Sequence, residues 1–313
     1  MVRRRNFLLA ASAGLIAGSA RAQTPLPKDP AMADIAEDVS REKEGLALAL
    51  GGGAAKAFAH IPYLESLDAL GVRPREVAGT SMGSILGALY CDGMSGREIR
   101  DYVVDLFTRR QSLLKKLLID TGDTWGSLIN IFRPAVVEPE VLFAALFPEG
   151  MARDFSELEI PLTIVATDFY RQNEYVMRDG PLLSAISASS CLPVLLTPVR
   201  RDGRVLIDGG FVNPTPFDLL DKARYFTAAI DVTGTDVEDT GEIPGSFETW
   251  AGSFSITQSS IVAEKVKCAR PDLFIEPAVG GFNPMDFFEV EDILAAADAD
   301  QDSFRRRIEK ILN

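Results

Sequence analysis

The sequence predicts an α/β fold in which a central, mostly parallel sheet is sandwiched by helices. Apolar runs of strand length alternate with helical patterns along residues 46–313, as in folds that carry helices on both faces of a parallel sheet. The first run, Leu46–Leu50, is continuously apolar and ends in glycines, which is typical of a buried parallel strand. No linker-like composition interrupts residues 46–313, so we expect one domain there.

Two strand–turn–helix units are expected first. After Leu46–Leu50, a helix should end at Gly71, with a kink or a shift in hydrogen bonding at Pro62. A strand at 76–78 and a helix at 84–90 make the second unit. The apolar residues that predict the first helix by their spacing of three are Phe58, Ile61, Leu64 and Leu67.

The rest of the chain continues the alternation. Residues 97–147 are expected to be helical but irregular, with exposed-looking apolar residues around Lys115, Lys116 and Trp125. A C-terminal helix is indicated by Phe304, Ile308 and Leu312, which recur every four residues. The remaining expected elements are strands at 161–166, 174–177, 204–207, 226–232 and 272–275, and a helix at 181–191.

The N-terminal residues 1–22 have the pattern of an export signal. Arg4 and Arg5, followed by Asn6-Phe7-Leu8, resemble the bacterial twin-arginine motif. The apolar stretch that follows is too short to span a bilayer but suits a signal peptide. Cleavage after Ala22 would leave Gln23 first, at the start of a polar segment, 23–45. We therefore expect the twin-arginine export machinery as a partner and a periplasmic or secreted location; the alternative is an uncleaved N-terminal anchor.

Charge and composition exclude several classes of function. The formal net charge of −13 argues against nucleic-acid binding, because phosphate contacts require basic patches. Three cysteines, an odd number, make no disulfide framework, and we interpret Cys91, Cys191 and Cys268 as small buried hydrophobes. His60 is the single histidine, which rules out sites with two histidine ligands. We expect neither a metal nor a cofactor.

A possible nucleophile lies in the segment Gly79-Thr80-Ser81-Met82-Gly83. A serine on a sharp turn between a strand and a helix is exposed and strained, as nucleophiles of hydrolases are. The same pattern also occurs in plain glycine-rich turns. The α/β-hydrolase fold, which often has this turn, needs a histidine after the serine. No histidine follows Ser81, so that fold is excluded.

Two further glycine-containing segments follow expected strands. The amides of Gly51, Gly52 and Gly53 could bind an anion at a helix N-terminus, such as an oxyanion during ester hydrolysis. Neither nucleotide-binding glycine pattern is complete here. In the other segment, Asp208 precedes Gly209 and Gly210, so its carboxylate could lie where α/β active sites form. A simple Asp-Gly turn is the alternative.

Taken together, the glycine loop, the serine turn and the Asp-Gly-Gly segment resemble the patatin-like phospholipases. The similarity runs from about Leu46 to Leu220 and includes Lys56, the segment 185–198 with its two prolines, and the segment 208–216. It implies a single patatin-like domain, with a catalytic core at 46–220 that residues 221–313 complete.

The resemblance also implies roles for individual residues. Ser81 would be the nucleophile and Asp208 its only catalytic partner, through an acyl-enzyme intermediate and without histidine. The amides of Gly51, Gly52 and Gly53 would bind the oxyanion, and His60 would be structural. The residues expected to support these motifs are Lys56, Gly79, Gly83, Gly209 and Gly210.

This chain departs from the family pattern at two positions, since Ala54 and Ala57 stand where the family usually has glycine. If either position needs a positive φ, the oxyanion loop is weakened. Three hypotheses therefore stay open: hydrolysis of acyl esters in phospholipids or lysophospholipids with transient membrane contact, hydrolysis of small soluble esters, and lipid binding with weak catalysis. An acyl-chain cleft or lid formed by residues 97–147 would favour lipids.

Overall fold

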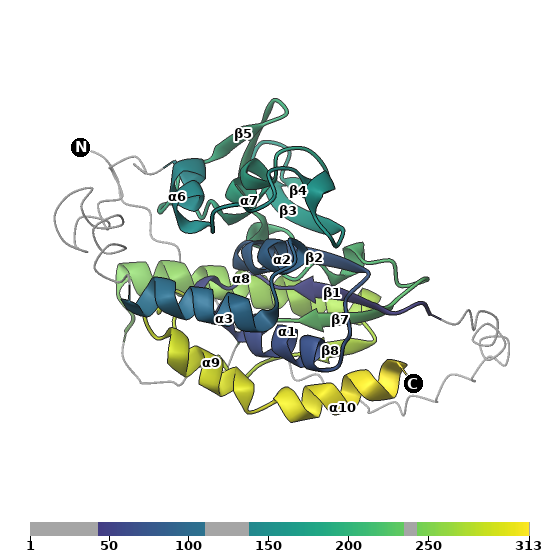
Figure 1. The fold of residues 1–313 in the computed structure, drawn as a ribbon. Coiled ribbons are helices and arrows are strands. Elements are labelled where there is room, and N and C mark those ends of the chain that lie inside the picture. Colours follow the sequence, from purple (N-terminus) through teal and green to yellow (C-terminus); the bar gives the residue numbers. More distant parts are fainter. Residues whose placement is uncertain (1–42, 110–137, 235–242, 313) are drawn as a thin grey trace, which may run out of the picture. The chain divides into compact units, whose positions relative to one another are not determined.

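An eight-stranded sheet organises the part of the chain that the computed structural model describes, residues 43–109, 138–234 and 243–312. Its hydrogen-bonded order is β5-β6-β3-β2-β1-β7-β8, with β4 paired to β3 (Figure 1). The strands are β1 (Leu46–Leu50), β2 (Glu76–Thr80), β3 (Leu162–Asp168), β4 (Asn173–Met177), β5 (Val199–Arg201), β6 (Arg204–Asp208), β7 (Phe226–Ile230) and β8 (Leu273–Ile275).

The central strands are parallel and the edge that carries β4, β5 and β6 is antiparallel. Parallel pairs join β3 to β2, β2 to β1, β1 to β7 and β7 to β8. This confirms the predicted α/β fold with a mostly parallel sheet. All the expected strands form, and the sequence analysis missed only the three-residue β5.

Helices cover both faces of the sheet, and β1 shows how the sequence fits these two environments. Leu46, Leu48 and Leu50 face the larger core cluster, which also contains side chains of α1 (His60–Ala69), α2 (Met82–Cys91), α3 (Gly96–Val104) and α7 (Leu182–Ser190). Ala47 and Ala49 face the smaller cluster, where α8 (Ser246–Ala269) packs. Alternation of large and small residues lets α8 lie close to the sheet.

The segment after the glycine loop begins as a 3₁₀ helix, η2 (Ala54–Ala59), and continues as α1. Pro62 is the third residue of α1, just after η2 ends, and it has no N–H to donate to the preceding turn. The sequence predicted a kink or a shift in hydrogen bonding at Pro62. The structure shows a change from a 3₁₀ helix to an α-helix two residues before it. The helix α1 ends next to Gly71, whose φ of +67° is easily adopted by glycine.

The irregular region between α3 and β3 is described only in part. The helix α3 continues as a π-helix, η3 (Asp105–Arg109), and α6 (Pro139–Leu146) follows the gap in the description. Short 3₁₀ turns lie at η4 (Phe155–Glu157), η5 (Gly209–Phe211) and η6 (Phe217–Leu219). The expected apolar residues near Lys115, Lys116 and Trp125, the export signal and most of the polar segment 23–45 lie outside the described residues.

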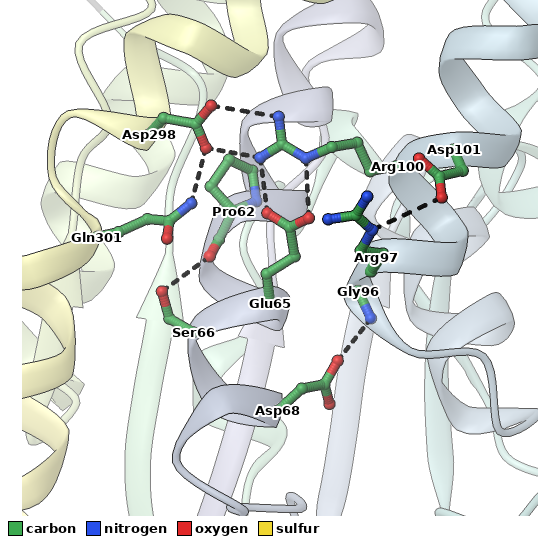
Figure 2. A network of polar contacts seen from close by, with 10 residues as sticks. All are labelled: Pro62, Glu65, Ser66, Asp68, Gly96, Arg97, Arg100, Asp101, Asp298 and Gln301. Carbon is green, nitrogen blue, oxygen red and sulfur yellow. Dashed lines mark hydrogen bonds and ion pairs between the residues drawn. The ribbon is translucent and has the colours of Figure 1, made fainter.

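Two helices that the sequence analysis did not identify, α8 and α9 (Val290–Asp298), complete the C-terminal part with the predicted α10 (Gln301–Leu312). Figure 2 shows how Arg100 joins α3 to α1 and to the end of α9. Its guanidinium donates to both carboxylate oxygens of Glu65, at 2.9 and 2.6 Å, and to those of Asp298, at 3.2 and 2.6 Å. Planar bidentate pairs of this kind fix helix positions as well as adding energy.

Cys91 and Cys191 are buried, as interpreted, and burial raises the pKa of the Cys191 thiol to about 12. Cys268 is exposed on α8, so the interpretation as a buried hydrophobe is wrong for this residue. Among the helices of the described residues, none has the length and apolar character that crossing a bilayer requires.

Candidate active site

Two strands meet end to end beside β3, and this meeting brings the predicted nucleophile and base together. Residues 164–165 of β3 pair with both β2 and β4, and residues 166–168 pair with both β4 and β6. Because a strand has two edges, β2 and β6 must share the edge opposite β4. Thr80 at the end of β2 pairs with Val165, and Asp208 at the end of β6 pairs with Ala166. Ser81, one residue beyond Thr80, therefore lies next to Asp208.

Ser81 occupies a strained turn between β2 and α2. Its φ of +53° and ψ of −128° are unfavourable for a residue with a side chain, and such strain concentrates at functional sites. The backbone N–H of Ser81 donates to Ser189 Oγ at 2.8 Å, and Ser189 Oγ donates to the Val165 carbonyl at 2.6 Å. The carbonyl of Ser81 accepts hydrogen bonds from the N–H and the hydroxyl of Ser84. These bonds hold the strained turn in place.

The glycines around Ser81 are required by close packing. A Cβ on Gly83 would lie 2.3 Å from the Leu50 carbonyl oxygen, and one on Gly79 would lie 2.7 Å from the Gly83 carbonyl oxygen. A side chain at either position would therefore push α2 away from β1 or β2. Gly52 packs against Ser81 itself, since a Cβ there would lie 3.1 Å from Ser81 Cβ. The glycine loop and the serine turn thus form one continuous surface.

The side chains of Ser81 and Asp208 are in direct contact. Ser81 Oγ donates to Asp208 Oδ2 at 2.7 Å, and the Gly210 N–H donates to Asp208 Oδ1 at 2.8 Å. Asp208 is buried, and this desolvation raises its pKa to about 6, although the two hydrogen bonds favour the charged form. Gly209 must lack a side chain, because a Cβ there would lie 2.2 Å from the Val165 carbonyl oxygen. The carboxylate can therefore accept a proton near neutral pH.

The amides of the glycine loop divide into two groups. The Gly51 N–H donates to the Ile230 carbonyl at 3.0 Å, and the Gly52 N–H donates to the Pro214 carbonyl at 2.9 Å. Within the described residues, no acceptor is found for the N–H groups of Gly53 and Ala54. The three predicted glycines therefore differ, because the amides of Gly51 and Gly52 fix the loop and only that of Gly53 is unbonded. Ala54, which was flagged only as a departure from the family pattern, supplies a second unbonded amide.

The two alanines of the loop have different consequences. Ala54 has a φ of +50°, the left-handed conformation that glycine adopts without cost and alanine at about 1–2 kcal/mol. Ala57 is buried inside η2 and is absent from the positive-φ residues of the described chain. The expected weakening thus applies to Ala54 alone, and the surrounding structure imposes the strained conformation there.

Two buried ionisable side chains, His60 and Lys56, hold the glycine loop and its neighbouring segment in place through hydrogen bonds to backbone carbonyls. His60 donates from Nε2 to the Gly51 carbonyl at 2.7 Å, and burial lowers its pKa to about 4, so the ring is neutral at physiological pH. Lys56 Nζ donates to the Thr233 carbonyl at 2.8 Å, and burial lowers its pKa while nearby Asp231 opposes that shift. Neither side chain contacts Ser81 or Asp208 through a hydrogen bond in the described structure.

A polar cluster that the sequence analysis did not find holds the segment after the Asp-Gly-Gly motif. The carbonyl of Asn213 accepts a hydrogen bond at 2.7 Å from the hydroxyl of Thr80, the residue before Ser81. Lys265 of α8 donates to the Asn213 side chain, to the Thr215 carbonyl and to Asp218. The signal for this cluster could not be read from sequence, because Lys265 follows Asn213 by more than fifty residues.

An apolar cavity of about 50 Å³ lies next to α2. One of its residues, Met82, directly follows Ser81, and others come from α3, η3 and α6. Its single phenol, Tyr102, donates to the Leu146 carbonyl. The lining residues from the region 97–147 are Tyr102, Val103, Leu106, Phe107, Phe143, Leu146 and Phe147.

Comparisons with known proteins identify the family of this chain. Residues 48–221 match the family model described as "Patatin-like phospholipase". The chain is 30% identical over 208 residues to Patatin-like phospholipase domain-containing protein 6 of Mus musculus, which covers 66% of this chain and 15% of the mouse protein. It is 31% identical over 193 residues to the Uncharacterized NTE family protein Mb1092c of Mycobacterium bovis, covering 61% of this chain and 50% of that protein. The chain thus spans half or less of these curated relatives.

Among solved structures, VipD from Legionella pneumophila aligns with a TM-score of 0.48 at 14% identity, covering 86% of this chain and 67% of that chain. The family model covers more than half of the present chain and includes the glycine loop, the serine turn and the Asp-Gly-Gly segment. This chain therefore belongs to the patatin-like phospholipase family.

Proposed function

We propose that this protein is a serine hydrolase that cleaves acyl esters of phospholipids or lysophospholipids through Ser81 and Asp208. The observation that carries the proposal is the 2.7 Å hydrogen bond from Ser81 Oγ to the buried carboxylate of Asp208. A carboxylate with a pKa of about 6 is ionised at neutral pH yet basic enough to share a proton in the transition state. No histidine is then needed as an intermediate base.

The reaction proceeds through two transfers of the acyl group. Ser81 Oγ bonds to the ester carbonyl carbon while its proton passes to Asp208, and the alcohol leaves with that proton as the carbon–oxygen bond breaks. Water then attacks the acyl-Ser81 ester while Asp208 accepts its proton. The fatty acid departs and the proton returns to Ser81 Oγ.

In this proposal the oxyanion donors are the unbonded amides of Gly53 and Ala54, at the start of η2. Each preorganised donor of this kind contributes about 3–4 kcal/mol to the transition state. The amides of Gly51 and Gly52, already engaged by Ile230 and Pro214, hold the loop beside Ser81. Lys56 and His60 act indirectly by fixing the carbonyls and the turn beneath the loop.

Lipid esters are favoured over small soluble esters by the apolar cavity next to Met82. An acyl group on Ser81 would have apolar side chains from α2, η3 and α6 as its neighbours, and each buried methylene contributes about 0.8 kcal/mol. To test this assignment, Leu146→Trp should reduce hydrolysis of long-chain p-nitrophenyl esters more than that of the acetate ester. Val141→Trp, on the exposed side of α6, is the matched control. Equal loss for both esters would argue for a small-ester hydrolase.

The proposed chemistry is tested with a fluorophosphonate probe, which labels activated serines. We expect labelling of the protein that starts at Gln23, and no labelling of Ser81→Ala or Asp208→Asn. Hydrolysis of a panel of phospholipids and lysophospholipids should be lost in the same two variants. Labelling that survives in Asp208→Asn would contradict the role of the carboxylate, and wild-type protein that never labels would favour a lipid-binding protein.

We also propose that the protein is exported by the twin-arginine machinery and acts outside the bacterial cytoplasm. The support is the Arg4-Arg5 motif with its apolar stretch and the small residues Ala20 and Ala22. Substitution of both arginines by lysine should leave the precursor in the cytoplasm. Recovery of unprocessed wild-type protein in the membrane would instead indicate an anchor.

A further inference from the structure

Helix α8 places one face against the Asp208-Gly209-Gly210 turn, although it lies beyond the residues that the family model matches. The side chains on this face recur every three or four residues, which puts them on one stripe. The Phe254 ring packs on Phe211, with centroids 4.4 Å apart, and Val262 belongs to the smaller core cluster. Lys265 binds Asn213. Between them in this stripe lies Gln258.

Gln258 is a largely buried residue whose amide makes no hydrogen bond to the described residues, and this amide is not among their fully enclosed unpaired polar atoms. Its side chain belongs to a residue that is 3% exposed, yet none of the hydrogen bonds among residues 43–109, 138–234 and 243–312 involves it. An amide that has no protein partner and is not fully enclosed can bind a water molecule. A position next to Val262 on a stripe that packs against the sheet would suit an apolar residue better. The amide is therefore available to bind a small polar partner such as water.

The position of the amide indicates what that partner is. A Cβ built on Gly210 would lie 2.2 Å from Gln258 Nε2 and 3.0 Å from Asp208 Oδ1. The amide and the carboxylate therefore approach the same side of Gly210, within the distance that one water molecule can bridge. Glycine at position 210 is also what leaves room for the amide.

We propose that Gln258 positions the water molecule that hydrolyses the acyl-Ser81 intermediate; this inference rests on the function proposed above. After acylation, Ser81 Oγ has no proton to donate, and Asp208 is free to accept one from water. The Gln258 amide holds that water oxygen while its proton passes to Asp208. The oxygen bonds to the acyl carbon, the bond from that carbon to Ser81 Oγ breaks, and Asp208 returns the proton to Ser81. Gln258 exchanges no proton, so it is a positioning residue for the second half-reaction.

The proposal predicts that a substitution at Gln258 separates the two half-reactions. Stopped-flow hydrolysis of a p-nitrophenyl ester resolves a burst of nitrophenol from acylation and a steady state limited by the slower step. In Gln258→Met we expect a burst rate within about twofold of wild type and a steady-state rate about ten- to a hundredfold lower. Mass spectrometry should show the acyl group accumulating on Ser81. Hydroxylamine, which attacks esters without a general base, should restore turnover.

The Tm of the variants separates the two roles of Gln258. A purely structural role predicts a lower Tm when Gln258 is replaced, whereas the proposed role does not. Methionine has similar length and no unpaired amide, so Gln258→Met should have an equal or higher Tm, by up to a few degrees. A second variant, Gln258→Asn, keeps an amide but shortens its reach, and we expect the same kinetic separation. Thr257→Val, on the exposed side of the same turn, should change neither half-reaction.

The outcomes distinguish this inference from the proposed function. If wild-type protein forms an acyl-enzyme and turns over, but both Gln258 variants keep the wild-type steady-state rate or lose burst and steady state in parallel, the role of Gln258 is refuted alone. If wild-type protein neither labels at Ser81 nor releases nitrophenol, the proposed function fails and this inference fails with it.

Discussion

Replacing Asp208 with asparagine should stabilise the folded protein at neutral and alkaline pH while it abolishes ester hydrolysis. Burial raises the pKa of Asp208 from 3.8 to about 6, and a shift of two pKa units corresponds to about 3 kcal/mol. Asparagine carries no charge to desolvate and can still satisfy both neighbours. Its amide oxygen can accept from the Gly210 N–H, and its amide nitrogen can donate to Ser81 Oγ, in place of the two bonds that the carboxylate accepts.

The pH dependence gives the sign of this effect. Between pH 4 and 6 the folded wild-type protein holds a proton on Asp208 that the unfolded chain has already released. The free energy of unfolding contributed by Asp208 therefore falls as pH rises through this window and stays constant above it. The stability difference between Asp208→Asn and wild type should be near zero at pH 4 and should reach about 3 kcal/mol, as an upper value, above pH 7.

Chemical denaturation of both proteins at a series of pH values measures this difference. Asp179→Asn, which removes an exposed carboxylate, is the control, and its stability should follow wild type across the range. In parallel, kcat/KM of the wild type for a p-nitrophenyl ester should fall below pH 6, about tenfold for each further pH unit, as Asp208 becomes protonated. A wild type more stable than Asp208→Asn at pH 8, or a difference that does not change with pH, would refute the reasoning.

Three other substitutions test separate parts of the fold and site. Ala54→Gly should raise the free energy of unfolding by up to about 1 kcal/mol, because glycine adopts the φ of +50° without strain; a loss measured by denaturation would contradict this. Arg100→Met should cost about 1–3 kcal/mol in the same assay by removing the bidentate bonds to Glu65 and Asp298, and an unchanged Tm would contradict it. Lys265→Met should slow fluorophosphonate labelling and lower the Tm, because the segment at Asn213 loses the hydrogen bond that Lys265 donates to it. The control Lys267→Met, at an exposed position on the same helix, should change neither.

The sequence predicted the sheet well because buried parallel strands carry a strong local signal. Leu46–Leu50 is apolar throughout, 226–230 has one polar residue, and 162–168 has an apolar centre at Ile164–Ala166. The long helix α8 was missed because its exposed face is rich in serine and threonine, and its buried stripe alternates apolar and polar side chains such as Val262 and Lys265. A helix whose contacts include a polar cluster gives a weak apolar periodicity.

In the candidate site, sequence motifs identified Ser81 and Asp208, whose side chains are in contact, but they did not indicate which backbone amides of the glycine loop are unbonded. Ser81 and Asp208 could be paired only through the resemblance to the patatin-like phospholipases, because neither segment is specific by itself. Which loop amides are free could not be inferred, since the acceptors for Gly51 and Gly52 are Ile230 and Pro214, far away in sequence. Gln258 lacks any motif, and only the packing of α8 reveals its place beside Gly210.

The features of this site share one physical property, which is that each is unfavourable for the folded state taken alone. Ser81 and Ala54 adopt positive φ, and Asp208 carries a charge in a desolvated position. Costs of this kind, each about 1–3 kcal/mol, are retained only where the surrounding packing imposes them. Here the imposing elements are the parallel strands and the tight contacts of Gly83. In the proposed mechanism, a lone carboxylate can act as the base for Ser81 because the rest of the fold holds both groups in these unfavourable states.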